Sequence, residues 1–169
     1  MVAAYLRDMG IPFELHIIGD GYERSRILYT ALDLNLEGQV ILHGKLSPEK
    51  VRQQLQLADV FVFASLSEGL PNSVLEAMSC GLCVVTSDCG GVREAVNNGV
   101  EGFVLPAREP KLMAEALRKL AVDVDLRRKM GAAARKRAQE EFRLEDQIEA
   151  FIALFDSARS SDRTGELRE

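Results

Sequence analysis

The middle of the chain combines a short apolar run, a loop with glycine and proline, and a helical pattern. The apolar run, residues 59–64 (D-V-F-V-F-A), is β-branched and aromatic, which is typical of a buried parallel strand. Gly69 and Pro71 favour a loop after it, and a helical pattern then runs from about Ser73 to Gly81. A buried strand that leads through a loop into a helix is the repeating unit of an open α/β sheet. In such a sheet, ligands bind outside the carboxyl ends of the strands.

Strand patterns and helical patterns alternate along the chain. The expected strands are residues 13–18, 40–42, 59–64, 82–86 and 103–105. The expected helices are residues 1–10, 23–34, 48–58, 73–81, 92–97, 110–121, 125–141 and 145–158. This alternation predicts the α/β class, with a Rossmann-like parallel sheet of five or six strands and helices on both faces. We expect one domain over residues 1–158, followed by a polar C-terminal tail, residues 159–169, that is frayed or disordered.

Two acids bracket the central loop. Glu68 follows the carboxyl end of the expected strand, and Glu76 falls in the first turns of the expected helix. A helix N-terminus at this edge presents free backbone N–H groups and a positive dipole end, which suits an anionic ligand such as a phosphate. The spacing fits a purely structural interpretation equally well. In that case Ser73 and Glu76 form an S-x-x-E capping box, and Glu68 is a solvated loop acid.

The whole string around these acids resembles a known family. Residues 68–78, E-G-L-P-N-S-V-L-E-A-M, are similar to the Glu-x7-Glu signature of the retaining glycosyltransferases of the GT-B fold, the large group-1 (family four) set. Residues 81–91, G-L-C-V-V-T-S-D-C-G-G, follow the pattern of that family too, and the resemblance covers about residues 11–142. Members have two Rossmann-like domains, and this chain resembles the C-terminal one, which binds the nucleotide-sugar donor. Cys83 departs from the family, which usually has proline there.

The resemblance implies roles for the central loop and helix. Glu76 would hydrogen-bond the ribose hydroxyls of the nucleotide, and Glu68, the candidate catalytic residue, would bind hydroxyls of the donor sugar. The backbone N–H groups of Gly69, Leu70 and Asn72 would face the sugar or the phosphates. The implied reaction transfers a sugar to an acceptor hydroxyl with retention at the anomeric carbon. Positioning and stabilisation of the diphosphate charge would supply most of the catalysis.

Three further turns belong to the implied donor site. Gly19 and Gly21 follow the first expected strand, and the family places this turn near the nucleotide diphosphate. The backbone around Leu46 would frame the nucleobase, and residues 90–91, a glycine pair, would lie near the donor. A tight strand-to-helix turn explains Gly19 and Gly21 equally well. The two glycines do not make a dinucleotide fingerprint, because Arg24 stands where that motif has its third glycine.

The resemblance also implies a ligand and a partner. The expected substrate is a nucleotide-diphosphate sugar of the UDP or GDP type, and we expect no cofactor and no metal site. The family has an N-terminal acceptor domain and a Gly-Arg…Lys segment that neutralises the diphosphate, and this sequence matches neither. We therefore expect the chain to be inactive without an acceptor domain or a partner subunit. Two alternatives stay open: a non-catalytic nucleotide-sugar-binding or interaction module, and a fragment of a nucleotide-sugar epimerase of the GT-B fold.

Composition argues against several other classes. The formal net charge is −5, and no clustered basic surface is expected, so nucleic acid is not an expected partner. No apolar run reaches the roughly 18 residues of a membrane span, which favours a cytoplasmic location. The basic segment 127–137 fits the solvated face of a helix, and a peripheral contact with the inner face of the membrane is the alternative. Cys80, Cys83 and Cys89 are odd in number and are expected to be small packed residues, not disulfides.

Overall fold

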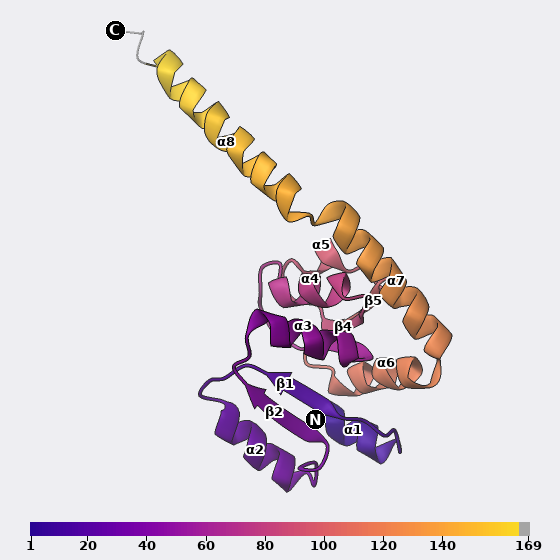
Figure 1. Ribbon diagram of the computed structural model, residues 1–169. Coiled ribbons are helices and arrows are strands. Elements are labelled where there is room, and N and C mark those ends of the chain that lie inside the picture. The colour runs from indigo at the N-terminus through magenta and orange to yellow at the C-terminus, as the bar shows by residue number, and fades with distance from the viewer. Residues whose placement is uncertain (166–169) are drawn as a thin grey trace.

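Parallel strands and helices alternate in the computed structural model, which describes residues 1–165 (Figure 1). The strands are β1 (Leu15–Ile18), β2 (Val40–Gly44), β3 (Val60–Phe63), β4 (Cys83–Ser87) and β5 (Gly102–Leu105). The helices are α1 (Val2–Asp8), α2 (Arg24–Asp33), α3 (Pro48–Leu57), α4 (Asn72–Ser79), α5 (Val92–Ala95), α6 (Pro110–Val122), α7 (Val124–Glu141) and α8 (Leu144–Gly165). The predicted α/β class is therefore confirmed, and each predicted strand has its counterpart.

The strands form two sheets. One sheet has the order β1–β2 and the other the order β3–β4–β5, and every pair is parallel. The prediction of a single sheet of five or six strands is thus wrong. Neighbouring strands of a continuous sheet exchange backbone hydrogen bonds, and no ladder joins β1 to β3 in the described part of the chain.

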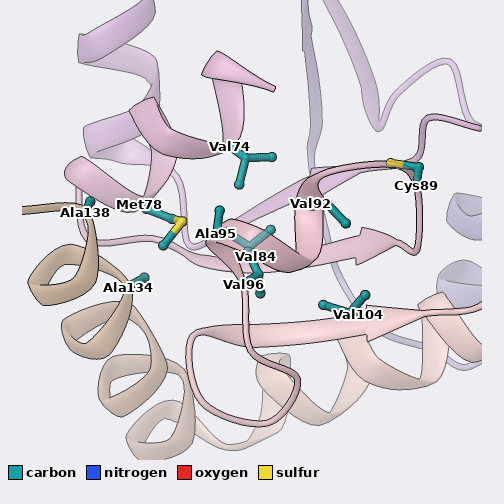
Figure 2. Packing of buried hydrophobic residues seen from close by; sticks show 10 residues of the cluster. All are labelled: Val74, Met78, Val84, Cys89, Val92, Ala95, Val96, Val104, Ala134 and Ala138. Atoms are coloured by element: carbon teal, nitrogen blue, oxygen red, sulfur yellow. The ribbon is translucent and has the colours of Figure 1, made fainter. Parts of the chain in front are cut away.

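The core is built on β4, whose five residues are all buried because helices cover both of its faces. On one face, Val84 lies in a cluster with Val74 and Met78 of α4 and with Ala134 and Ala138 of α7 (Figure 2). On the other face, Cys83 and Val85 pack with residues of α6 and α7, namely Met113, Leu120 and Met130. Continuous apolar side chains on a central strand are what a sheet buried on both faces requires.

Helix α1 connects the two sheets. Ala4 packs in a cluster with Phe13, which precedes β1, and with Val40, the first residue of β2. Val2 instead packs against the cluster around Val85 of β4, and α1 as a whole lies against α6. One short helix therefore packs against residues of both sheets.

A buried ion pair fixes α7 to the turn that leads into β5. The side chain of Glu101 is 5% exposed and lies 3.8 Å from Nη1 of Arg137, measured from its Oε1 atom. The other carboxylate oxygen of Glu101 accepts the backbone N–H of Asn97 at 2.7 Å. Nη2 of Arg137 also donates to the carbonyl oxygen of Glu94 at 3.0 Å. Arg137, one residue of the basic segment 127–137, therefore makes contacts within the fold and is not a solvated surface charge.

Helix α8 projects away from the body of the molecule (Figure 1). It runs to Gly165, well beyond the predicted end near Ala158, so a helix occupies most of the segment expected to be frayed. Six large apolar side chains of α8 are exposed: Leu144, Ile148, Phe151, Ile152, Leu154 and Phe155. Among residues 1–165, no helix has the length and apolarity needed to cross a membrane.

Candidate donor-binding site

The loop after β3 is tied to the carboxyl end of β4. The hydroxyl of Ser87, which is buried, donates a hydrogen bond to the carbonyl oxygen of Ser65. The hydroxyl of Ser65 lies 3.3 Å from Oε1 of Glu68 and donates to it. Two hydroxyl groups therefore connect the end of a buried strand to the carboxylate that the sequence predicts as catalytic. Glu68 itself is exposed, as a group that meets a ligand must be.

A second loop packs directly on the backbone of the first. A β-carbon at Gly90 would lie 1.6 Å from the carbonyl oxygen of Glu68, and one at Gly91 would lie 3.2 Å from the backbone nitrogen of Leu70. Gly90 also has a φ of +51°, in the left-handed region. This position therefore requires glycine, both for its conformation and for the close approach of the two loops. Residues 90–91 therefore lie directly beside the central loop, and their predicted proximity to the donor stays a prediction.

Glu76 lies on α4 and does not cap it. The helix begins at Asn72 with Pro71 as its N-cap residue, and no side chain accepts a hydrogen bond from its first turn. Ser73 therefore lies inside the helix, and the capping-box interpretation is wrong. Glu76 is exposed, and its carboxylate makes no hydrogen bond or ion pair with the described residues. The fold leaves this acid free for a ligand.

The turns of the other sheet also follow carboxyl ends of strands. The N–H of Gly19 donates to the carbonyl oxygen of Gly44 at 2.9 Å, which joins the ends of β1 and β2. Oδ1 of Asp20 accepts the N–H of Gly21 at 3.0 Å. No atom lies within 4 Å of the β-carbon position of either Gly19 or Gly21, so the space beside each of these glycines is open. Leu46 is half-buried just beyond β2.

The predicted site residues thus fall into two groups. Glu68, Gly69, Leu70, Asn72 and Glu76 belong to the β3–α4 unit. Gly19, Gly21 and Leu46 follow β1 and β2. All of them come after the carboxyl end of a parallel strand, where an α/β fold binds its ligands. No hydrogen bond or ion pair between described residues joins the two groups.

An ion pair beside the Gly90 loop was missed from the sequence. Nε and Nη2 of Arg93 donate to Oδ1 and Oδ2 of Asp88 at 2.8 and 2.7 Å. The hydrogen bond from Arg93 holds the pKa of the Asp88 carboxyl below its usual range. The sequence carries a signal for this pair, since Asp88 and Arg93 are five residues apart across a strand-to-helix loop. The role of Ser87 was also missed, because its hydrogen bond connects loops that are distant in sequence.

The cysteines are packed, as predicted for small apolar residues. Cys83 and Cys89 are buried, Cys80 is half-buried, and all three thiols are free. Burial raises the pKa of the Cys83 thiol to about 11, because the thiolate would lose its hydration. A thiol that stays protonated at neutral pH is a poor nucleophile, so Cys83 acts as a core residue.

Comparison with known proteins identifies the family. The family model described as "Glycosyl transferases group 1" matches residues 2–137, and the chain belongs to this family. N-acetyl-alpha-D-glucosaminyl L-malate synthase of Bacillus anthracis is 28% identical over 157 residues, which are 93% of this chain and 41% of that enzyme. This chain therefore spans less than half the length of that curated relative.

Solved structures show the same fold. Sucrose-phosphate synthase from Thermosynechococcus elongatus gives a TM-score of 0.87 at 27% identity over 95% of this chain and 41% of that one. Anabaena Alr3699/HepE, solved with UDP-glucose, gives 0.84 at 22% identity over 92% and 44%. The C-terminal domain of a group 1 glycosyl transferase (LpcC) from Francisella tularensis gives 0.68 at 17% identity over 83% and 92%. The fold is that of the C-terminal domain of a GT-B glycosyltransferase.

Proposed function

We propose that this chain is the donor-binding half of a glycosyltransferase that moves a sugar from a nucleotide sugar to an acceptor hydroxyl with retention. The nucleotide sugar is of the UDP or GDP type. Glu76 accepts hydrogen bonds from the ribose hydroxyls, and Glu68 accepts them from the sugar. The backbone N–H groups at the start of α4 face the phosphates. The acceptor site belongs to an N-terminal domain or a partner subunit.

The observation that carries this proposal is the state of Glu76. The carboxylate has no capping role and no partner among residues 1–165, yet it lies on the helix that follows the carboxyl end of β3. Glu68 is held on the same unit by a hydroxyl, with no cation of the described chain paired to it. Two exposed acids without a cationic partner among the described residues fit a neutral, hydroxyl-rich ligand such as a ribose or a sugar. The UDP-glucose complex of the Anabaena structure supports the choice of ligand class.

A titration of nucleotides and nucleotide sugars into the 15N-labelled chain tests the assignment. Glu76→Gln keeps one acceptor oxygen but loses the charge and the paired acceptance. We expect it to weaken binding of UDP or GDP, free or sugar-linked, by about 1–3 kcal/mol. Glu68→Gln removes a contact to the sugar alone, so it should weaken only the sugar-bearing donor. Chemical shift changes report the affinity of each protein for each ligand.

Glu37→Gln is the matched control, because Glu37 is an exposed acid just before the amino end of β2. It should bind every ligand as the wild type does. Equal affinity of wild type, Glu68→Gln and Glu76→Gln for both kinds of ligand would overturn the assignment. The wild-type chain alone should transfer no sugar. Robust transfer by the pure wild-type chain would overturn the proposed need for an acceptor domain.

A further inference from the structure

Helix α5 is a single turn that carries the glycine pair, residues 90–91, at its amino end. Gly91 is its N-cap residue, and no side chain accepts a hydrogen bond from its first turn. The side chains of Val92 and Ala95 are buried in the cluster around β4 (Figure 2). A helix of four residues has too few internal hydrogen bonds to be stable by itself. Its contacts with neighbouring elements therefore set where the glycine pair lies.

The carboxyl end of α5 is held by one side chain of α7. Nη2 of Arg137 donates to the carbonyl oxygen of Glu94 at 3.0 Å and lies 3.0 Å from Oε2 of Glu141. That carbonyl belongs to the last turn of α5, where a cation is favoured by the partial negative charge of the free carbonyl groups. The Arg137 side chain is mostly buried, so water screens these contacts little.

The same guanidinium also holds the segment that follows α5. Nη1 of Arg137 lies 3.8 Å from Oε1 of Glu101, and the other oxygen of that carboxylate accepts the N–H of Asn97 at 2.7 Å. A buried carboxylate needs a cation nearby, and Arg137 supplies it. Nε of Arg137 is buried without a hydrogen-bond partner among residues 1–165. One guanidinium thus serves three acceptor groups, at the cost of one unsatisfied N–H.

The amino end of α5 is packed on the loop of Glu68. The N–H of Glu94 donates to the carbonyl oxygen of Gly91 at 2.9 Å, so the residue bound by Arg137 is joined to the glycine pair. The backbone of Gly90 in turn lies against the carbonyl group of Glu68, with no room between them for a β-carbon. Groups packed this closely do not move independently. A shift of α5 therefore displaces the loop that carries Glu68.

We propose that Arg137 is a positioning residue for the donor sugar. It fixes α5, and through the glycine pair it fixes the place of the Glu68 carboxylate. The inference rests on the proposed function, in which Glu68 binds the sugar and Glu76 the ribose. Glu76 lies on α4, which packs on α7 through the side chains of Val74 and Met78. Loss of Arg137 therefore affects binding of the sugar and spares binding of the nucleotide.

Amide spectra of the 15N-labelled chain test this coupling without a ligand. Arg137→Met removes every polar contact of the side chain, and Arg137→Lys keeps its charge but not its planar fork of donors. Lys136→Met is the matched control, because Lys136 is the preceding residue of α7 and its side chain is 74% exposed. We expect Arg137→Met to shift the amide resonances of Glu68 and Gly69, Arg137→Lys to shift them less, and Lys136→Met to leave them in place. Resonances of Glu68 and Gly69 that neither Arg137 variant moves would refute the positioning role, and Arg137→Lys keeps this test decisive if Arg137→Met does not fold.

Titration of a nucleotide sugar and of its free nucleotide tests the selectivity of the effect. The probes are UDP-glucose with UDP, and GDP-mannose with GDP. We expect Arg137→Met to weaken binding of the sugar-bearing probe by about fivefold and to leave binding of the free nucleotide unchanged. Arg137→Lys should recover part of the loss. A general loss of structure would weaken both probes equally, and that result would contradict the proposal.

Glu68→Gln separates this inference from the proposed function. Selective weakening of the sugar-bearing probe by Glu68→Gln, but not by Arg137→Met, would leave the function in place and exclude the role of Arg137. No selective effect of Glu68→Gln, or no binding of either pair of probes by the wild type, would overturn the proposed function and this inference with it. Selective weakening by both variants, with none in Lys136→Met, is the result that we expect.

Discussion

The backbone of Gly90 lies so close to the carbonyl oxygen of Glu68 that a β-carbon on Gly90 would be 1.6 Å from it. Glycine is therefore needed on the β4–α5 loop to set the position of an acid on the β3–α4 loop. Ser87 and Ser65 connect the same two loops from the strand side. Together with the hydrogen bond from the Ser65 hydroxyl to Oε1 of Glu68, these contacts position the acid without a cationic partner.

Gly90→Ala should displace the Glu68 loop. The added methyl group cannot occupy its position, and alanine at a φ of +51° carries a further conformational cost. We expect the free energy of unfolding to fall by about 1–3 kcal/mol and the affinity for the sugar-bearing donor to fall more than that for the free nucleotide. Urea denaturation and ligand titration measure the two effects separately.

Gly38→Ala is the control for this change, because Gly38 has an ordinary φ and no atom within 4 Å of its β-carbon position. Its stability should match the wild type within about 0.5 kcal/mol. A Gly90→Ala protein with unchanged stability and unchanged donor affinity would contradict the packing described for the two loops.

The ion pair of Glu101 and Arg137 should couple more strongly than a shorter pair at the surface. Their side chains are 5% and 18% exposed, whereas those of Glu23 and Arg26, 2.9 Å apart, are 65% and 80% exposed. Water screens the exposed pair and leaves it worth less than about 0.5 kcal/mol. Removing Arg137 leaves the buried Glu101 carboxylate without a cation, so we expect a coupling on the order of 1–3 kcal/mol.

A double-mutant cycle with Glu101→Gln and Arg137→Met measures this coupling by urea denaturation. The same cycle with Glu23→Gln and Arg26→Met is the reference. Equal coupling energies in the two cycles would show that burial does not strengthen the pair, in spite of its low exposure.

The Cys83 thiol should make stability fall at alkaline pH. Its pKa is raised from 9.0 to about 11, so the folded state holds its proton more tightly than the unfolded state. The stabilising effect is complete below pH 9 and is lost as the pH rises through 11. Cys83→Ala should show a shallower loss of stability between pH 9 and 11, and Cys80→Ala should follow the wild type. Parallel curves for all three proteins would refute this account.

Asp88 should titrate below its ordinary pKa of 3.8, because Arg93 donates two hydrogen bonds to its carboxylate. A lowered pKa means that the pair stabilises the fold above the unfolded pKa and stops doing so as the pH falls through the folded pKa. NMR titration of the carboxyl carbon measures this value. Arg93→Gln should raise the pKa of Asp88, and a pKa that the change leaves unaltered would exclude the pair in solution.

Local patterns predicted the strands and helices and the placement of the candidate acids on them. The alternation of strands and helices is encoded within windows of a few residues, and so is the position of Glu68 after β3. The first residue of α4 was harder to predict, because the S-x-x-E spacing of Ser73 and Glu76 also occurs inside a helix. Pro71 is extended, with φ −76° and ψ 120°, and the helix begins directly after it. Proline lacks an N–H and has a restricted φ, and both suit the position just before a helix.

Contacts between distant segments could not be predicted in this way. The division into two sheets depends on which strand edges meet, and nothing within β1 or β3 alone specifies a partner. The bond from Ser87 to Ser65 and the approach of Gly90 to Glu68 join loops separated by a helix and a strand. The resemblance of residues 68–78 to a family motif singled out the two acids. The contacts that hold the loop of Glu68 became visible only in the three-dimensional structure.

Helix α1 has a consequence for the way this chain is made. It leaves the ribosome before the other described elements, and its partner α6 lies beyond all five strands in the sequence. Until α6 and β4 have emerged, Val2 lacks the residues that it packs against in the finished fold, and only the side of α1 that meets β1 and β2 is covered. Helix α1 therefore completes its contacts only after the strands and α6 have been synthesised. Agents that act on nascent chains, such as chaperones and proteases, have that interval in which to reach it.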